Sequence, residues 1–201
     1  MNLLAIDTSN RILSVALLTQ KGDIFPKQQQ MERGQGEALI PLIQELFSES
    51  KQKVEDLGAV AVAVGPGSFT GVRIGLSCAK AFALALKIPV WGVTNLEAEA
   101  YGITQPVTVV LDSKRGDYFV QHFDKGRALD EPHIETEEQL KSTLSFTAIG
   151  DAAETLAQNI GCSIAQNKEP MAVAVAKIAL SRKDNPLPAH PLYLRQADVT
   201  V

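Results

Sequence analysis

Residues 57–75 read LGAVAVAVGPGSFTGVRIG, and this stretch decides the fold. Its first eight residues form a short, valine-rich apolar run, which is typical of a buried central strand. A glycine-rich turn follows, and residues 69–87 then show the periodicity of a helix. The sequence therefore predicts a strand, a tight turn and a helix, an arrangement in which many proteins bind a phosphate group.

The turn itself has the sequence GPGSFTG, and it departs from the phosphate-binding P-loop because no lysine follows its later glycine. Two interpretations remain. The backbone N–H groups of the turn could still cradle a phosphate. Alternatively, Gly65 and Gly67 allow a tight corner, and Ser68 or Thr70 caps the helix. The missing lysine favours the corner.

The residues on both sides complete a unit of three strands, a helix, a strand and a helix. Short apolar runs predict the strands, and a single apolar stripe at helical spacing predicts the helix before the central strand. Thr94 is placed to cap the helix that ends the unit. The predicted strands are 3–6, 12–18, 24–30 and 88–93, and the predicted helices are 37–47 and 95–101.

A second copy of this order begins at residue 105. An apolar run that ends in aspartate, and a Lys-Gly turn, both recur at an offset of 104–105 residues. The copy predicts strands at 107–111, 118–123, 146–149 and 163–165 and helices at 151–160 and 171–181, followed by a tail too rich in proline for regular structure.

Two βββαβα units in tandem predict an α/β protein with the actin-like (ASKHA) fold, built from duplicated ribonuclease-H-like units. Residues 1–104 would form the N-terminal lobe, and residues 105–201 a smaller C-terminal lobe with an extended tail.

Actin-like proteins that use ATP hold its phosphates on loops that carry glycine. The equivalent loops here are degenerate: residues 7–11 (DTSNR) contain no glycine, residues 112–116 (DSKRG) have it four positions late, and residues 149–151 (IGD) have one rather than a pair. We therefore expect no bound cofactor. An ATP-binding enzyme of the actin-like superfamily remains the alternative.

Other catalytic sites are not indicated. The histidines are His122, His133 and His190, with no HxxxH or HExxH spacing among them, which argues against a zinc peptidase. Asp7 and Asp112 could bind magnesium as nuclease carboxylates do, but the duplication places them in opposite halves. The serine of the glycine turn does not lie in a GxSxG motif. We expect neither a metal ligand nor a catalytic residue.

Small residues recur every fourth position along the helix at 69–87, namely Gly71, Gly75, Ala79 and Ala83. Such a row lets another backbone approach closely. The helix also has more apolar surface than one sheet can cover. Its second face could pack on the helix at 37–47 within the chain, or the two helices together could bind another subunit. The sequence leaves both explanations open.

The composition indicates which partners the chain can bind directly and in which cellular compartment it acts. The formal net charge is −4 and no run of Lys or Arg is present, so direct, independent binding of nucleic acid is not expected. Cys78 and Cys162 form no CxxC pair and are expected to be reduced. We see no leader and no apolar run of about 20 residues, so we expect a cytoplasmic location without a membrane span.

Several motifs together resemble the TsaB (YeaZ) family. They are LLAIDTSNRILSVAL at 3–17, GEALIPLIQELF at 36–47, VAVGPGSFTGVRIGLSCAKAFALAL at 62–86, LDSKRGDYFV at 111–120 and PLYLR at 191–195. The resemblance implies a cytoplasmic bacterial protein of tRNA modification and tRNA processing. Such a protein would be the non-catalytic scaffold, or dimerization subunit, of the complex that forms threonylcarbamoyladenosine.

The resemblance also implies partners. TsaD would form a heterodimer with the chain through a helix bundle, TsaE would join the assembly, the chain alone would form a homodimer, and tRNA would be reached only indirectly. Many members of the family have a histidine shortly before the helical glutamate, where this chain reads RGQGE at 33–37. The implied partner interface comprises Leu39, Leu42, Ile43, Gly71, Val72, Arg73, Gly75, Leu76 and Ala79.

Overall fold

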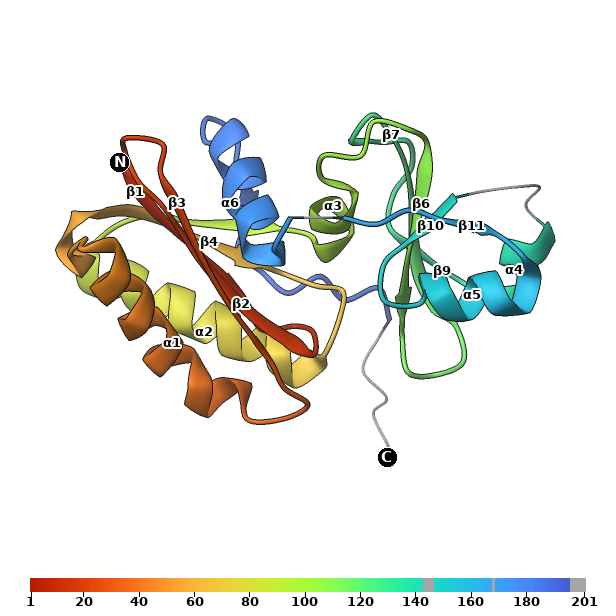
Figure 1. Ribbon diagram of the computed structural model, residues 1–201, viewed down its shortest axis with the longest axis horizontal. Coiled ribbons are helices and arrows are strands. Elements are labelled where there is room, and N and C mark those ends of the chain that lie inside the picture. The colour runs from red at the N-terminus through yellow and green to blue at the C-terminus, as the bar shows by residue number, and fades with distance from the viewer. Residues whose placement is uncertain (143–146, 168, 196–201) are drawn as a thin grey trace.

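The computed structural model describes residues 1–142, 147–167 and 169–195, which form two lobes side by side (Figure 1). Each lobe is built on its own β-sheet with helices packed against it, as expected for an α/β fold. The first lobe is defined here by the sheet β12-β5-β4-β1-β2-β3, and the second by β11-β10-β6-β7-β8 with β9 paired to β7.

The first sheet has β1 at its centre, antiparallel to β2 and parallel to β4. Its strands confirm the predicted ones to within two residues. The apolar runs of β1, β2 and β4 are buried on both faces, whereas β3 is an exposed edge strand. The structure adds one short strand, β12, in the proline-rich tail, where the sequence predicted no regular structure. The strands are β1 (Asn2–Asp7), β2 (Ile12–Leu18), β3 (Ile24–Gln30), β4 (Leu57–Ala63), β5 (Val90–Val93) and β12 (Leu187–Pro188).

Helices cover both faces of the first sheet. Helices α1 (Gln35–Ser50) and α2 (Phe69–Leu86) lie side by side on one face, and α6 (Met171–Ser181) lies on the other (Figure 1). Successive residues of β1 alternate between them: Leu4 and Ile6 pack toward α1 and α2, whereas Leu3 and Ala5 pack toward α6. A 3₁₀ turn, η1 (Val54–Asp56), leads into β4.

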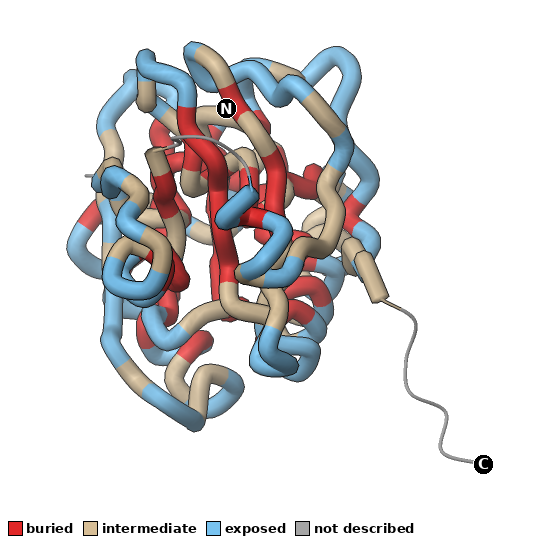
Figure 2. The backbone as a smooth tube through the Cα atoms, turned by 90° about the vertical axis from the view of Figure 1, so that its right-hand side faces the viewer, coloured by how far each residue is buried: buried red, intermediate tan, exposed pale blue. Residues whose placement is uncertain are grey.

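The second sheet follows the predicted order, with short additions. The strands are β6 (Val107–Asp112), β7 (Tyr118–Asp124), β8 (Arg127–Ala128), β9 (His133–Glu135), β10 (Thr147–Ile149) and β11 (Ser163–Ile164), and the helices are α4 (Glu137–Ser142) and α5 (Ala153–Ile160). Residue 146, where a strand was predicted to begin, lies outside the described residues. Figure 2 shows the buried strands of this lobe beneath exposed helices and loops.

The expected division at residue 104 is wrong for two helices, because each half of the chain lends one helix to the other lobe. Helix α6 packs on β1, β2 and β4 of the first sheet. Conversely, Leu96 and Ala100 of α3 (Asn95–Ala100) join the core of the second sheet. The reason is that the second face of the first sheet is largely apolar, and α6 covers most of it with help from Ala98 of α3.

Candidate functional site: an inter-lobe cleft and a helical groove

A cleft of about 1050 Å³ lies between the two lobes. The three loops that hold phosphates in actin-like ATP-binding proteins do face one another across it. The first loop contributes Asn10 and Arg11, the second Lys114 and Arg115, and the third Asp151. The sequence therefore predicted correctly which loops meet, and their chemistry decides what the cleft can hold.

The glycine-rich turn is a corner whose polar groups are bonded within the chain. The N–H of Gly65 donates to Asn95 Oδ1 at 3.1 Å, and the N–H of Ser68 donates to the carbonyl of Ser9 at 2.9 Å. The side chain of Ser68 caps α2 by accepting from the N–H of Gly71 at 3.2 Å. These three N–H groups are engaged within the chain, which favours the corner interpretation.

The first loop is likewise tied to its own strand. Asp7 is fully buried, and its Oδ1 accepts from the N–H and the hydroxyl of Ser9, at 2.9 and 2.5 Å. Burial raises the pKa of Asp7, although the bonds from Ser9 oppose that change. Asp112 lines the cleft, whereas Asp7 is buried and does not line it. The structure does not present the two aspartates together as a magnesium site.

In the second loop, the carboxylate of Asp112 is paired with Lys114 of the same loop. The Oδ1 of Asp112 accepts from the N–H of Lys114 at 2.7 Å, and its Oδ2 pairs with the ammonium of Lys114 at 2.7 Å. These bonds lower the pKa of Asp112 despite its partial burial. Asp151 accepts from the N–H of Asp112 at 2.8 Å, and burial raises the pKa of Asp151.

Glu99, on α3 between the lobes, titrates near neutrality. Burial, reinforced by the negative charges of Asp151 and Asp7, raises the pKa of Glu99 from 4.5 to about 7. Folded Glu99 therefore keeps its proton in a range where the unfolded chain has lost it. Because the folded state binds the extra proton, this group makes stability fall as the pH rises from about 4.5 to 7.

Glu99→Gln is expected to remove that pH dependence. At pH 8 the variant should be more stable than the unchanged protein by about 1–3 kcal/mol, since an ionised, poorly solvated carboxylate is gone. At pH 4.5 both side chains are neutral, and the two proteins should be equally stable. Urea unfolding at the two pH values measures the difference. An equal gain at both pH values would contradict the assignment.

A second concave surface, here called the α1–α2 groove, lies on the outer side of the first lobe. It has a volume of about 860 Å³ and is lined mainly by apolar side chains. Among them, Phe69 is 50% exposed and Ile40 is 46% exposed. Only 28% of the residues of α2 are buried, although Arg73 and Lys80 are its only charged residues. The groove is lined by Leu39, Ile40, Phe69, Ile74, Phe82 and Ala85, among others.

Helix α2 is the one described helix that is long and apolar enough to cross a membrane. By length and composition alone its 18 residues meet the requirement. In the structure they follow β4, and one face packs on the first sheet. The apolar character is therefore divided between a core face and an exposed face.

The structure buries eight of the nine expected interface residues in the core of the chain itself. Only Arg73 is exposed; the buried ones are Leu39, Leu42, Ile43, Gly71, Val72, Gly75, Leu76 and Ala79. Leu39 still borders the groove at its base. The sequence identified the helices that line the groove but not which of their faces is exposed, because both faces of α2 are apolar and periodicity alone does not distinguish them.

The small-residue row serves the first loop rather than a partner. A Cβ at Gly71 would lie 2.2 Å from the carbonyl oxygen of Thr8, and one at Gly75 would lie 2.6 Å from Thr8 Oγ1. The hydroxyl of Thr8 donates to the carbonyl of Gly71 at 2.6 Å. The glycines therefore allow α2 to lie directly against the end of β1.

Sequence reasoning missed an aromatic cluster at the edge of the groove. The guanidinium of Arg73 lies 3.6 Å from the ring centre of Phe69, and its Nε donates to the hydroxyl of Tyr193 at 3.0 Å. The rings of Phe69 and Tyr193 are 5.6 Å apart. These contacts bring the tail onto the start of α2. The one signal in the sequence was an aromatic residue at the first position of the helix.

Comparison with known proteins identifies relatives of the chain. The family model described as TsaD, tRNA N6-adenosine threonylcarbamoyltransferase, matches residues 8–190. A *Bacillus subtilis* protein named tRNA threonylcarbamoyladenosine biosynthesis protein TsaB is 35% identical over 125 residues, which cover 59% of this chain and 53% of that protein. The *Escherichia coli* protein of the same name is 28% identical over 165 residues, covering 75% and 71%.

Solved structures agree with the fold. A *Pseudomonas aeruginosa* structure described as similar to peptidase YEAZ matches with a TM-score of 0.80 at 23% identity, covering 96% of this chain and 99% of that one. A *Clostridium difficile* dehydratase activator with bound ADPNP matches with a TM-score of 0.56 at 12% identity, covering 92% and 96%. The fold is thus actin-like, and the chain belongs to the TsaB (YeaZ) family of tRNA threonylcarbamoyladenosine biosynthesis proteins, within the wider family whose model is named for TsaD.

Proposed function

We propose that this protein is the non-catalytic dimerization subunit of the bacterial complex that forms threonylcarbamoyladenosine in tRNA. It binds TsaD through the α1–α2 groove, acts in the cytoplasm, is joined by TsaE, and reaches tRNA only through the complex. The observation that carries this proposal is the exposed apolar groove between α1 and α2. A surface of this kind on a globular protein marks an interaction site.

The shape of the groove supports a helical partner. Ala81 and Ala85 lie along its floor while Ile40, Phe69 and Phe82 line it, so small residues leave room between larger ones. A chain of the TsaD family has the same fold type, since its family model covers residues 8–190 here. It therefore has an equivalent helix pair to offer, and the two pairs would form a four-helix contact about a pseudo-twofold axis.

The same geometry explains homodimerization of the isolated chain. Without TsaD, a second copy offers the same apolar helix pair, and a twofold contact would cover both grooves at once. Ile40 and Phe69, which line the groove and are 46% and 50% exposed, would lose their water contact in either assembly.

The non-catalytic role is supported by the cleft. The N–H groups of Gly65 and Ser68 bond within the chain, and no HxxxH pair occurs in the sequence. The alternative, an ATP-binding enzyme, would need the cleft to accept Mg-ATP. Calorimetric titration of the isolated chain distinguishes the two. Micromolar binding that is lost in Asp7→Ala would favour the alternative.

Ala81→Arg tests the docking proposal. Ala81 is exposed on the floor of the groove, so the long charged side chain should leave the fold intact but prevent close helix packing. We expect the variant to lose the one-to-one complex with TsaD from the same organism, a decrease in affinity on the order of 100-fold or more. Size exclusion with light scattering, on the mixture and on each chain alone, measures it.

Ser48→Arg is the matched control. Ser48 is exposed on α1 but lies outside the groove, so the same substitution there should leave the complex unchanged. Ala81→Arg should also be monomeric when alone. If Ala81→Arg still bound TsaD as the unchanged protein does, the groove would not be the docking surface.

A further inference from the structure

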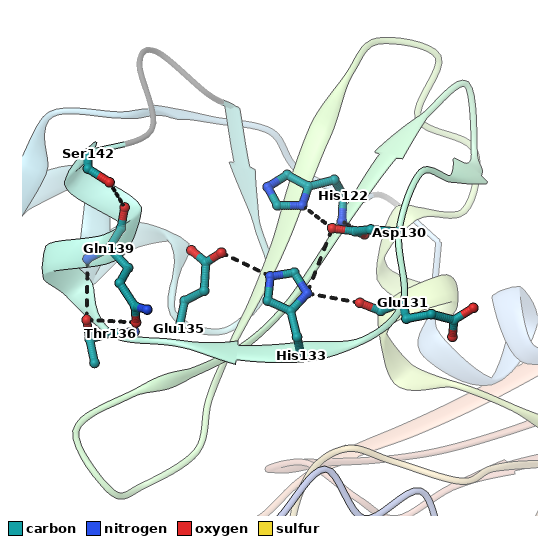
Figure 3. A network of polar contacts seen from close by, with 8 residues as sticks. All are labelled: His122, Asp130, Glu131, His133, Glu135, Thr136, Gln139 and Ser142. Carbon is teal, nitrogen blue, oxygen red and sulfur yellow. Dashed lines mark hydrogen bonds and ion pairs between the residues drawn. The ribbon is translucent and has the colours of Figure 1, made fainter.

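Two histidines and an aspartate gather on the second lobe, and none of them lines the cleft or the groove. His122 lies on β7 and His133 on β9, and these strands pair with Val120 opposite His133. Asp130 comes from the segment between β8 and β9. Figure 3 shows the carboxylate of Asp130 between the two imidazole rings, which are stacked with centres 5.8 Å apart.

The imidazoles present the same atom to this carboxylate. Nδ1 of His122 lies 2.6 Å from Oδ2 of Asp130, and Nδ1 of His133 lies 3.8 Å from the same oxygen. The three ligand atoms offered by the cluster all lie within 4.8 Å of one another. In a tetrahedral zinc site, bonds of about 2.0–2.1 Å separate neighbouring ligand atoms by about 3.3–3.4 Å. The observed separations bracket that value.

Asp130 is held in place by β7. Its Oδ1 accepts from the backbone N–H of His122 at 2.9 Å, and its carbonyl accepts from the side chain of the buried Gln121 at 2.8 Å. These two bonds fix the carboxylate so that Oδ2 faces the imidazoles. A ligand whose orientation is fixed in advance loses less conformational entropy when it binds an ion.

Glu135 supports His133 from the opposite side. Its Oε1 lies 3.0 Å from Nε2 of His133, so this ring nitrogen donates its N–H to the carboxylate (Figure 3). This bond fixes the orientation of the ring so that Nδ1 faces Asp130 and the carbonyl of Glu131. A carboxylate behind a metal-binding histidine is the usual way of fixing its tautomer.

We propose that Nδ1 of His122, Nδ1 of His133 and Oδ2 of Asp130 bind one divalent transition-metal ion of the zinc type. Two imidazole nitrogens and one carboxylate oxygen suit Zn²⁺, Co²⁺ or Ni²⁺ rather than Mg²⁺ or Ca²⁺, which prefer oxygen alone. Without an ion, the Nδ1–H of His133 donates to the carbonyl oxygen of Glu131 at 2.9 Å. Binding of the ion at Nδ1 releases this proton to the solvent, so the affinity rises with pH.

The site is open to the solvent. The side chains of His122, Asp130 and His133 are 31%, 33% and 36% exposed, so an ion can enter and a fourth position stays free for water. A bound ion would join β7 to the segment that leads into β9. It therefore stabilises the edge of the second lobe, because it binds only where these residues are held together.

The test uses the full chain without a histidine tag, freed of metal by a chelator. Competition with a chromophoric chelator measures Zn²⁺ affinity and stoichiometry, and the visible absorption of Co²⁺ reports its coordination. We expect one ion per chain and a thermal midpoint that rises with Zn²⁺. Glu135→Gln should weaken binding by about 10–100-fold, and His122→Asn and His133→Gln should weaken it more.

His190→Gln is the matched control, because the third histidine lies outside the cluster. It should bind Zn²⁺ as the unchanged protein does. Circular dichroism in the presence of chelator establishes whether each variant is folded. If a ligand variant fails to fold, Glu135→Gln still tests the proposal, because it keeps all three ligands. Absence of stoichiometric binding, or equal affinity in the folded His133→Gln variant, would overturn the proposal and leave a hydrogen-bonded histidine pair only.

Discussion

Gly71→Ala should destabilise the protein by about 3 kcal/mol or more, although alanine is the better helix former. In an open helix this exchange stabilises by roughly 1 kcal/mol. Here the added methyl carbon would lie 2.2 Å from the carbonyl oxygen of Thr8, which is backbone and has no rotamer to change. Either α2 or the end of β1 must move, and such overpacking is costly. Urea unfolding measures the change.

The contact at Gly71 is difficult to relax because the first loop is held from several sides. The hydroxyl of Thr8 donates to the Gly71 carbonyl, the Ser9 carbonyl accepts from Ser68, and the Ser9 hydroxyl accepts from Asn95. A shift that accommodates one methyl group would lengthen these bonds together. We therefore expect the loss to appear as lower stability and not as a local rearrangement.

Gly36→Ala is the matched control on the neighbouring helix. A Cβ at Gly36 would meet only the side chain of Ile74, at 3.6 Å, which is an ordinary van der Waals distance. This variant should be as stable as the unchanged protein or more stable by up to about 1 kcal/mol. Two glycine-to-alanine exchanges in helices should thus have opposite signs. Destabilisation of similar size by both would show that the Thr8 contact is not the cause.

Residues 1–104 alone are expected not to fold cooperatively, although they contain five of the six strands of the first sheet. The face of that sheet which carries Leu3 and Ala5 is covered by α6, whose Ala172, Val173 and Ala174 are buried there. Without α6 this apolar face is exposed to water. The fragment also exposes Leu96, which packs in the second lobe. Urea unfolding of the fragment should show no sharp transition.

A second fragment provides the control. Asn167 donates from its side chain to the carbonyls of Ala98 and Glu99, at 3.0 and 3.1 Å, so the segment before α6 lies beside the end of α3. Residues 1–104 joined by a short glycine-serine linker to residues 166–195 should regain a cooperative transition. A cooperative transition in residues 1–104 alone would show that the first lobe does not need α6.

The chain's elements were predictable because their signals are local. The valine-rich run at 57–63, the glycine turn and the threonine at 94 each specify a strand, a corner or a cap within a few residues. Helix α6 was predicted with the correct bounds from its apolar run. The short elements β9 and α4 were missed, because three to six residues carry too little periodicity to detect.

The location of the candidate sites was only partly predictable. The sequence indicated which loops line the cleft and which helices carry apolar surface. It did not indicate which face of α2 remains free, because Gly71 and Ala81 both belong to apolar stripes and only the position of Thr8 assigns one of them to the core. It also did not pair His122 with His133, since eleven residues and a turn separate them along the chain.

By itself, the sequence determined the type and order of the elements, the duplication and the family, because these depend on patterns a few residues long. Only the tertiary structure decided that α6 covers the first sheet, that the small-residue row packs on Thr8, and that two histidines meet at Asp130. The physical reason is the same in each case. These contacts depend on strand register and on which apolar faces are left uncovered, and both are properties of the packed chain as a whole.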